Sequence, residues 1–280
     1  MDARVWNGGA GHAWVAAQTA LDQMFAPFDD LLCNDLLADG LTGQVLDVGC
    51  GTGSTMRALA ERGMDCTGID PSGPMLAAAR ARMEQAGAAA HFIQADAGTY
   101  MFAPGEFDAL VSRFGVMFFA DPVAGFANLR GATRPGGCLR FAAWRGTAEN
   151  PFQVTAEEAA RPLLPELPPR KPDEPGQFAL ADRDRVFSIL KDSGWAAIEI
   201  EPVDVVCRFA RTELETYIAV MGPVGRALQQ ADDATRARVM DRVRPAFDAF
   251  VDGEDVAFTA ACWMANARAP LVLKRDVRDT

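Results

Sequence analysis

A glycine-rich turn at residues 45–54 carries the clearest chemical signal in this sequence. An apolar run contains Asp47, and three glycines follow it at alternate positions, Gly49, Gly51 and Gly53. Glycine lets the backbone turn sharply and leaves room for a ligand to lie against the main chain. A helix that begins at such a turn presents free N–H groups and the positive end of its dipole. We therefore expect a negatively charged ligand group at this turn.

A second acid, Asp70, ends the next strand-like run, about 20 residues after the turn. An acid at this position commonly accepts hydrogen bonds from ribose hydroxyls, although it could also serve only to start the helix that follows Ser72. The glycine spacing is G-x-G-x-G, whereas nicotinamide enzymes use G-x-G-x-x-G. These residues predict a site for a nucleoside with an anionic end.

The elements that position these residues are consecutive βα units around a parallel sheet. Short apolar runs alternate with helical patterns between residues 44 and 144. Strands are expected at 45–48, 66–70, 91–95, 107–111 and 138–144, and helices at 55–62, 75–85 and 123–132. In such sheets ligands bind beyond the carboxyl ends of the strands, where the glycine turn and Asp70 both lie.

The pattern changes after residue 150. A helix is expected at 182–193, a strand at 197–207, helical periodicity at 211–250 and a closing strand at 256–266. The sequence thus predicts four parts: an N-terminal helical lid segment (1–40), a Rossmann-like core (41–146), an irregular insertion (147–181), and a part that completes the sheet and carries a helical lid at about 211–252 (182–280).

Composition and charge limit the partners. The chain is 49% hydrophobic and 23% charged, as in ordinary globular proteins, and no apolar run approaches the ~20 residues that cross a bilayer. The net charge of −11 disfavours nucleic acid and anionic lipid. Six scattered cysteines and two histidines offer no metal-ligand spacing. We expect a cytoplasmic protein with no metal, no nucleic-acid partner and no membrane insertion, and the sequence leaves a homodimer open.

The run Asp47-Val48-Gly49-Cys50-Gly51-Thr52-Gly53 resembles the first motif of class I S-adenosylmethionine-dependent methyltransferases. Three further segments are similar in order and spacing: 68–72 with Met75 and Leu76, 94–97, and 107–112 with 129–137. The resemblance covers residues 41–145, and the lead-in is similar to that of small-molecule enzymes related to ubiquinone and menaquinone biosynthesis. It implies an α/β fold with a seven-stranded, mostly parallel sheet, helices on both faces and a helical lid.

The resemblance also implies a reaction and a set of contacts. Methyl transfer from S-adenosylmethionine to a small-molecule acceptor would leave S-adenosylhomocysteine. The three glycines would face the donor's methionine portion, and Asp70 its ribose. Asp96 would accept from the adenine amino group beside the Ala97 N–H, although it could also be a turn-forming residue. The other residues expected around the donor are Asp47, Pro71, Met75, Ser112, Trp6 and Trp14.

The acceptor is expected to be mainly apolar. Its pocket would be bordered by Arg113, Phe114, Met117, Trp144 and Tyr217. Because the sulfonium donor is already activated, holding the acceptor in line with the methyl–sulfur bond supplies most of the catalysis. A base is needed only for an acceptor proton of high pKa. The candidates for such a role are His12, Arg113 and Tyr217, whereas His91 begins a strand at the opposite end of the sheet.

Two other functions remain open at this point. A nicotinamide-dependent oxidoreductase is disfavoured by the glycine spacing, and neither tyrosine is followed by lysine four residues later. A methyltransferase-like scaffold that binds without turnover stays open, because methyl transfer needs few dedicated residues. The run Asn150-Pro151-Phe152 resembles a signature of amino-group DNA methyltransferases, but in those enzymes it follows the fourth strand rather than the fifth.

Overall fold

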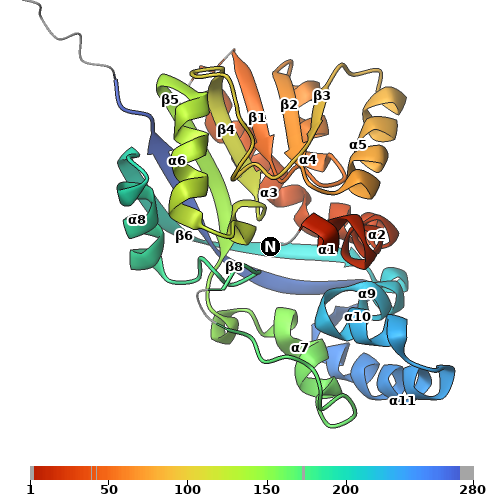
Figure 1. Ribbon diagram of the computed structural model, residues 1–280. Helices are drawn as coiled ribbons and strands as arrows, with labels where there is room; N and C mark the ends of the chain where they lie inside the picture. Colours follow the sequence, from red (N-terminus) through yellow and green to blue (C-terminus); the bar gives the residue numbers. More distant parts are fainter. Residues whose placement is uncertain (1–2, 39, 42, 172–173, 272–280) are drawn as a thin grey trace, which may run out of the picture.

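The computed structural model describes residues 3–38, 40–41, 43–171 and 174–271, and it is built around one sheet (Figure 1). Seven strands lie in the order β3-β2-β1-β4-β5-β8-β6, and the short β7 pairs with β8. The strands are β1 (Gln44–Val48), β2 (Asp65–Asp70), β3 (His91–Gln94), β4 (Phe107–Arg113), β5 (Thr133–Trp144), β6 (Ala196–Ala210), β7 (Val251–Asp252) and β8 (Asp255–Arg268).

The sheet is mostly parallel, as the sequence predicts. β1 pairs in parallel with both β2 and β4, and the parallel pairing continues to β3 and β5. Only β8 reverses this direction, running antiparallel to β5 and β6. The chain order changes direction at β1, so the carboxyl ends of β1 and β4 form the crevice where doubly wound sheets bind ligands.

Helices cover both faces of the sheet. Figure 1 shows α6 and α8 on the near face and α3 and α4 behind it, where α3 packs against α4 and β6. The helices are α1 (Ala3–Asn7), α2 (Gly9–Ala16), α3 (Gln18–Ala38), α4 (Ser54–Glu61), α5 (Gly73–Gln85), α6 (Pro122–Ala132), α7 (Pro151–Ala160), α8 (Arg183–Asp192), α9 (Leu214–Val220), α10 (Gly222–Gln230) and α11 (Asp233–Val243), with short 3₁₀ turns η1 (Val116–Phe118), η2 (Thr147–Glu149), η3 (Arg211–Glu213) and η4 (Arg244–Phe250).

Short side chains set the starts of the core helices. The Asp121 carboxylate accepts from the Ala124 N–H at 3.0 Å at the start of α6, and Pro122 supplies the first helical residue. Ser72 caps α5 in the same way, its hydroxyl accepting from the Met75 N–H at 3.4 Å. Each of these caps satisfies one of the free N–H groups of a helix start. The caps therefore fix where the connection after each strand ends.

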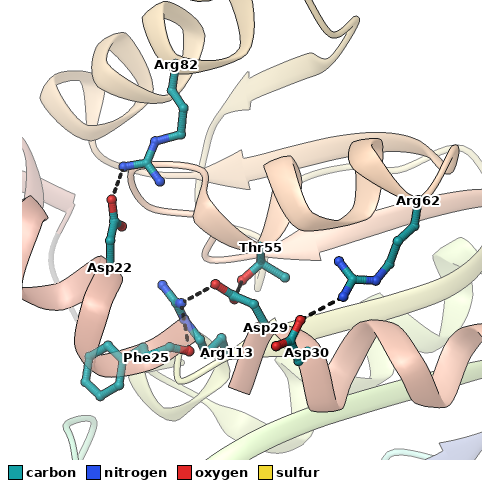
Figure 2. Close-up of polar contacts among 8 residues, drawn as sticks. All are labelled: Asp22, Phe25, Asp29, Asp30, Thr55, Arg62, Arg82 and Arg113. Atoms are coloured by element: carbon teal, nitrogen blue, oxygen red, sulfur yellow. Dashed lines mark hydrogen bonds and ion pairs between the residues drawn. The ribbon is translucent and has the colours of Figure 1, made fainter. Parts of the chain in front are cut away.

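Three acids bind α3 to the core along its length (Figure 2). Asp22 pairs with Arg82 of α5 at 2.5 Å, Asp30 with Arg62 at the end of α4 at 2.7 Å, and Asp29 with Arg113 at the end of β4 at 2.8 Å. The last pair is buried, so it lies in a less polar medium than the exposed carboxylate of Asp30. These contacts hold α3 as a fixed part of the core.

The predicted N-terminal lid segment therefore divides in two. α3 packs against the sheet, whereas α1 and α2 lie over the loop after β2. Asn7 donates to the Pro71 carbonyl at 2.8 Å and accepts from the Gly73 N–H at 2.9 Å, while the Ser72 hydroxyl donates to the Trp6 carbonyl at 2.8 Å. Three hydrogen bonds thus fix α1 to the connection between β2 and α5.

The region after β5 is more regular than the sequence predicts. The insertion expected to be irregular over 147–181 begins with η2 and the helix α7, because Pro151 suits a first helical position and Asn150 secures the entry. The Asn150 side chain exchanges two 2.9 Å hydrogen bonds with the backbone of Ala261. β6 and β8 are longer than expected, since they pair with each other as far as Ala210 and Asp255. The lid helices α9–α11 lie between these two strands in the chain.

Among the described residues, no helix is both long and apolar enough to cross a bilayer. A cytoplasmic location and a homodimer stay predictions from the sequence.

Candidate donor and acceptor cavity

One cavity of about 670 Å³ opens at the carboxyl ends of β1, β2 and β4. This volume lies within the ~300–1,000 Å³ typical of small-molecule sites. We call the part lined by the glycine turn, Asp70, Asp96, α1 and α2 the donor end. The part lined by α7, residues 168–171 and 174–179 of the insertion, α9 and α10 is the acceptor end. Both ends belong to the same cavity, so a donor and an acceptor can meet inside it.

The glycine turn leaves space where the resemblance places the donor. Gly49 and Gly51 have φ angles of +73° and +53°, which other residues adopt only at a cost in free energy. A Cβ atom at Gly49 would lie 2.7 Å from Gly115 Cα, so the β4 loop packs directly on this turn. A Cβ atom at Gly51 would approach only Met75 Sδ, at 3.9 Å, and both residues line the cavity. The backbone of Gly51 is therefore open to a ligand.

Asp70 is buried and points into the donor end. Its Oδ2 accepts from the Gly51 N–H at 3.0 Å and its Oδ1 accepts from the Ser72 N–H at 2.8 Å. Each oxygen keeps a further lone pair, which suits two neighbouring ribose hydroxyls. Burial raises the pKa of Asp70 to about 6, while the two backbone hydrogen bonds lower it. The carboxylate is thus fixed in direction and ionised at neutral pH.

Asp96 and Ala97 also line the donor end. The Asp96 Oδ1 accepts from the Gly98 N–H at 2.8 Å, which is the turn-forming role that the sequence left as an alternative. Its Oδ2 has room for another donor. The Ala97 carbonyl accepts from Asn128 at 2.9 Å, which holds this loop in place. The turn and the ligand contact are compatible, because they use different oxygens of the Asp96 carboxylate.

Asp47 lies beneath the turn rather than on the cavity wall. Its side chain is buried, and its Oδ2 has no hydrogen-bond partner among the described residues. Burial raises the pKa of Asp47 to about 8, an effect that Arg113 opposes and that Asp29 and Asp70 reinforce. An unpartnered buried carboxyl next to a ligand cradle fits a cationic group reached through water, such as the donor's ammonium. The residues at this end therefore fit S-adenosylmethionine.

Besides Asp47, three predicted residues do not reach the cavity wall. Gly53 begins α4 with φ +81°, and a Cβ atom there would lie 2.9 Å from Ala79 Cβ, so this glycine serves helix packing. The buried Ser112 hydroxyl donates to the Val48 carbonyl at 2.7 Å and accepts from the N–H groups of the β4 loop. His12 is exposed, and its ring contacts the Gly8 carbonyl at 3.0 Å. Gly53 and Ser112 thus position the cradle, and the structure places His12 away from it.

Arg113 lines the cavity but is already paired (Figure 2). Its guanidinium donates to Asp29 Oδ2 at 2.8 Å and lies 5.5 Å from the centre of the Phe25 ring. Thr55 donates to the other Asp29 oxygen at 2.6 Å. The arginine is therefore held by α3 and contributes a fixed positive charge between the two ends of the cavity.

An aromatic wall lines the cavity beside the donor end. Phe114 has φ +67° and stacks on Trp144, with ring centres 4.8 Å apart and 13° between the planes. Phe25 packs against both rings, and Met117 extends the wall. A non-glycine residue in the left-handed region costs of order 1–3 kcal/mol, which the packing of Phe114 must offset. The backbone strain directs this ring into the cavity.

The acceptor end combines aromatic and polar side chains. Tyr217 packs against Phe152 and Phe209, with 5.7 Å between ring centres in each pair. Burial raises the pKa of the Tyr217 hydroxyl, while Arg170 opposes the shift. At neutral pH this hydroxyl is protonated, so it can donate a hydrogen bond to an acceptor but cannot act as a base.

The other predicted residues line the cavity: Trp6, Trp14, Pro71 and Met75. Trp6 packs edge-on against Phe118 at 5.1 Å. Sequence reasoning did not find several wall residues, namely Phe25, Thr52, Thr55, Gln153, Arg170 and Arg226. Only Thr52, inside the glycine motif, carried a local signal. The others come from helices and an insertion whose positions depend on tertiary packing.

Comparison with known proteins agrees with this geometry. Residues 45–137 match the family model of a methyltransferase domain. The chain is 29% identical over 206 residues to a demethylmenaquinone methyltransferase of Renibacterium salmoninarum, covering 63% of this chain and 85% of that protein. It is 37% identical over 107 residues to the enzyme of that name from Thermus thermophilus, covering 38% of this chain and 49% of the relative, or about half its length.

A solved structure extends the likeness of the fold. Phosphoethanolamine N-methyltransferase 2 of Haemonchus contortus, in complex with S-adenosylhomocysteine, superposes with a TM-score of 0.57 at 20% identity. The match covers 93% of this chain and 57% of that one, and at this identity it shows the fold alone. The fold, the domain match and the relatives favour methyl transfer over nicotinamide chemistry and over a scaffold without turnover. Residues 45–137 thus form a methyltransferase domain, and the chain is similar to class I S-adenosylmethionine-dependent methyltransferases of the small-molecule type.

Proposed function

We propose that this methyltransferase acts on a small aromatic acceptor that carries one ionisable oxygen, such as a phenol or quinol. One observation carries the proposal: the donor end and an aromatic wall line the same cavity. The relatives named demethylmenaquinone methyltransferases support the same class, because their name specifies a quinone-type compound. Flat rings of this kind stack well on aromatic side chains.

The donor end holds the methyl donor by its three parts. Asp70 accepts from the ribose, Asp96 from the adenine amino group, and the open backbone at Gly51 receives the methionine portion. The Asp47 carboxylate balances the positive charge of the donor's ammonium group. When bound, the donor supplies a methyl group activated by positively charged sulfur. Trp6 and Trp14, on the helices fixed to Pro71 and Gly73, cover this end and exclude water.

The aromatic wall orients the acceptor. An aromatic ring held between Phe114 and the lid helices is fixed in plane and direction, which positions its oxygen toward the donor end. Such orientation accounts for about 7–11 kcal/mol of barrier lowering in well-positioned reactions. The Tyr217 hydroxyl, protonated at neutral pH, donates a hydrogen bond to an acceptor oxygen.

The cavity favours an acceptor that ionises easily. Neither histidine lines it, Tyr217 stays protonated, and Arg113 is paired with Asp29. The positive charge of the donor's sulfur instead stabilises an oxyanion on the acceptor. This supports phenols and quinols over alcohols of high pKa.

Methyl incorporation into an acceptor panel tests the proposal. Phenols and quinols should be methylated by the wild-type protein, and aliphatic alcohols should not. Trp144→Phe should raise the acceptor KM and leave the donor KM unchanged. Trp195→Phe is a matched control, because Trp195 is buried but does not line the cavity. Methylation of aliphatic alcohols, or an equal effect of the two tryptophan variants, would contradict an aromatic acceptor.

A further inference from the structure

The cavity wall contains one cation without an acidic partner. Four cationic side chains line the cavity among the described residues. Arg113 pairs with Asp29 at 2.8 Å, Lys171 pairs with Glu174 at 2.8 Å, and Arg170 forms a two-point ion pair with Glu157. The fourth cation is Arg226, on α10, and no ion pair or hydrogen bond of its guanidinium is found in the described part of the chain. Arg226 is exposed to solvent and lines the cavity, so its charge is accessible to a ligand that enters there.

Arg226 lies at the acceptor end. The charged groups that act on it are Glu157 and Arg170, and α10 packs against α7. Burial lowers the pKa of Arg226, Glu157 raises it and Arg170 lowers it. Glu157 carries one negative charge and is hydrogen-bonded to Arg170 through both oxygens, so Arg170, Arg226 and Glu157 together keep a net positive charge. A guanidinium nevertheless stays charged at neutral pH, so Arg226 adds a full positive charge to this end.

A second unsatisfied donor lies on the same helix face as Glu157. Gln153 precedes Glu157 by four residues on α7, so their side chains are neighbours. The Gln177 Oε1 accepts from Arg170 at 3.3 Å, so its Nε2 faces Gln153 and donates to Gln153 Oε1 at 2.8 Å. Within the described residues, the Gln153 Nε2 is then left buried without an acceptor. Buried donors of this kind are normally satisfied, here by a group that enters the cavity.

We propose that Arg226 and the Gln153 amide bind a carboxylate on the acceptor, so that the substrate is a small aromatic acid. The proposal rests on the proposed function and specifies its substrate class. A guanidinium and an amide N–H match the two oxygens of a carboxylate. The carboxylate binds at the acceptor end and directs the other end of the aromatic ring toward the donor. It is a binding group and is not itself methylated.

Acid and amide pairs test this directly. Binding of 4-hydroxybenzoate, 1-hydroxy-2-naphthoate and 3-(4-hydroxyphenyl)propionate is compared with that of their neutral carboxamides by calorimetry, with and without saturating S-adenosylhomocysteine. The variants are Arg226→Gln, Arg226→Lys and Gln153→Leu. Arg238→Gln is the matched control, because Arg238 lies on lid helix α11, is exposed and does not line the cavity. The melting temperature of each free variant confirms that it is folded.

The wild-type protein should bind at least one acid ~10-fold or more tighter than its amide, as expected when a charged partner is present. Arg226→Gln should remove this preference, Arg226→Lys should keep part of it, and Arg238→Gln should leave it intact. No acid preference in any pair, or a preference that survives in Arg226→Gln, overturns the proposal. A variant that loses only S-adenosylhomocysteine affinity also overturns it, because Arg226 would then bind the donor's carboxylate. If the wild-type protein does not bind S-adenosylhomocysteine, the proposed donor site is contradicted. The comparison of acids with amides in the absence of S-adenosylhomocysteine still tests whether the acceptor carries a carboxylate.

Discussion

The Asp70 carboxylate accepts a 3.0 Å hydrogen bond from the Gly51 N–H, so the acid that ends β2 and the turn that follows β1 form one bonded unit. The register of β1 against β2 brings them together, since Val48 pairs with Ile69 immediately before both. Under the proposed function, Asp70 therefore both binds the ribose and supports the backbone that receives the methionine portion of the donor.

Donor affinity should rise with pH around the pKa of Asp70. Burial raises that pKa from 3.8 to about 6, and the ionised carboxylate is the better acceptor for ribose hydroxyls. S-adenosylhomocysteine should bind about tenfold more tightly at pH 7 than at pH 5. The contribution of Asp70 to the free energy of unfolding changes with pH in the opposite direction. Because folding favours the protonated form of Asp70, this contribution is full below pH 4 and is lost as the pH rises through 6. Calorimetric titration and urea unfolding across pH 4–7.5 measure both; Asp70→Asn should flatten both curves over this range.

Donor binding should release a proton from Asp47. Burial raises the pKa of Asp47 to about 8, so at pH 7.5 a large fraction is protonated before the donor's ammonium arrives. A nearby positive charge favours the carboxylate and expels the proton. The apparent enthalpy of binding should therefore vary with the ionisation enthalpy of the buffer in the wild-type protein. In Asp47→Asn the dependence should vanish; if it persists unchanged, the proton comes from another group.

Asn7→Ala should release the N-terminal helices from the donor site. The side chain bonds the Pro71 carbonyl and the Gly73 N–H, and Trp6 covers the cavity beside it. Losing these two hydrogen bonds, and the 3.1 Å bond from Gln94 Nε2 to Asn7 Oδ1, should cost about 1–3 kcal/mol of donor affinity, mainly as faster dissociation. Stopped-flow displacement of S-adenosylhomocysteine measures the rate. Asn128→Ala is the comparison, because Asn128 of α6 holds the loop of Asp96 and Ala97. An off-rate equal to that of the wild-type protein in Asn7→Ala would show that α1 does not retain the donor.

Two glycines of similar backbone conformation should respond differently to alanine. Gly49 and Gly63 have φ angles of +73° and +78°, but a Cβ atom at Gly63 would touch nothing within 4 Å, whereas at Gly49 it would lie 2.7 Å from Gly115 Cα. Gly63→Ala should cost ~1–2 kcal/mol from the backbone alone and keep donor binding. Gly49→Ala should cost more and lose the donor, because the β4 loop must move. Equal losses in urea unfolding would mean that the close approach at Gly49 is unimportant.

At Phe114 the usual order of stability of alanine and glycine variants should reverse. Removing the ring loses its packing on Trp144 and Phe25, which is expected to cost about 3–5 kcal/mol. Glycine tolerates φ +67° without strain, whereas alanine does not. Phe114→Gly should therefore be at least as stable as Phe114→Ala, in contrast to most sites. Thermal unfolding of the two variants checks the order, and a less stable glycine variant would indicate that the loop relaxes once the ring is removed.

The donor end could be predicted from the sequence because its residues follow strands in a fixed local pattern. The glycine turn, Asp70 and Asp96 can each be recognised from a short, continuous stretch of sequence. Within that pattern, Ser112 was assigned to the donor and instead hydrogen-bonds the backbone beneath the turn. Ser112 and Arg113 are consecutive strand residues that point to opposite faces of the sheet, and only Arg113 lines the cavity.

The acceptor end could not be predicted in the same way. Gln153, Arg170 and Arg226 are separated by long stretches of chain and meet only because the insertion and the lid pack together. The position of His12 could have been found from helical spacing, because Ala10, Ala13 and Trp14 share the face of α2 that lines the cavity. His12 falls on the other face.

The two ends of the lid segment lie next to each other at the edge of the paired strands β6 and β8. Arg211, immediately after β6, donates its backbone N–H to the Glu254 carbonyl at 2.8 Å, immediately before β8. The forty-odd residues between them form an insertion whose two ends lie side by side on paired strands. The length and sequence of this insertion can therefore change without altering the strand order. Natural variation in that insertion would therefore diversify the compounds accepted while the methyl donor stays the same, and exchanging it between related enzymes offers a route to new selectivities.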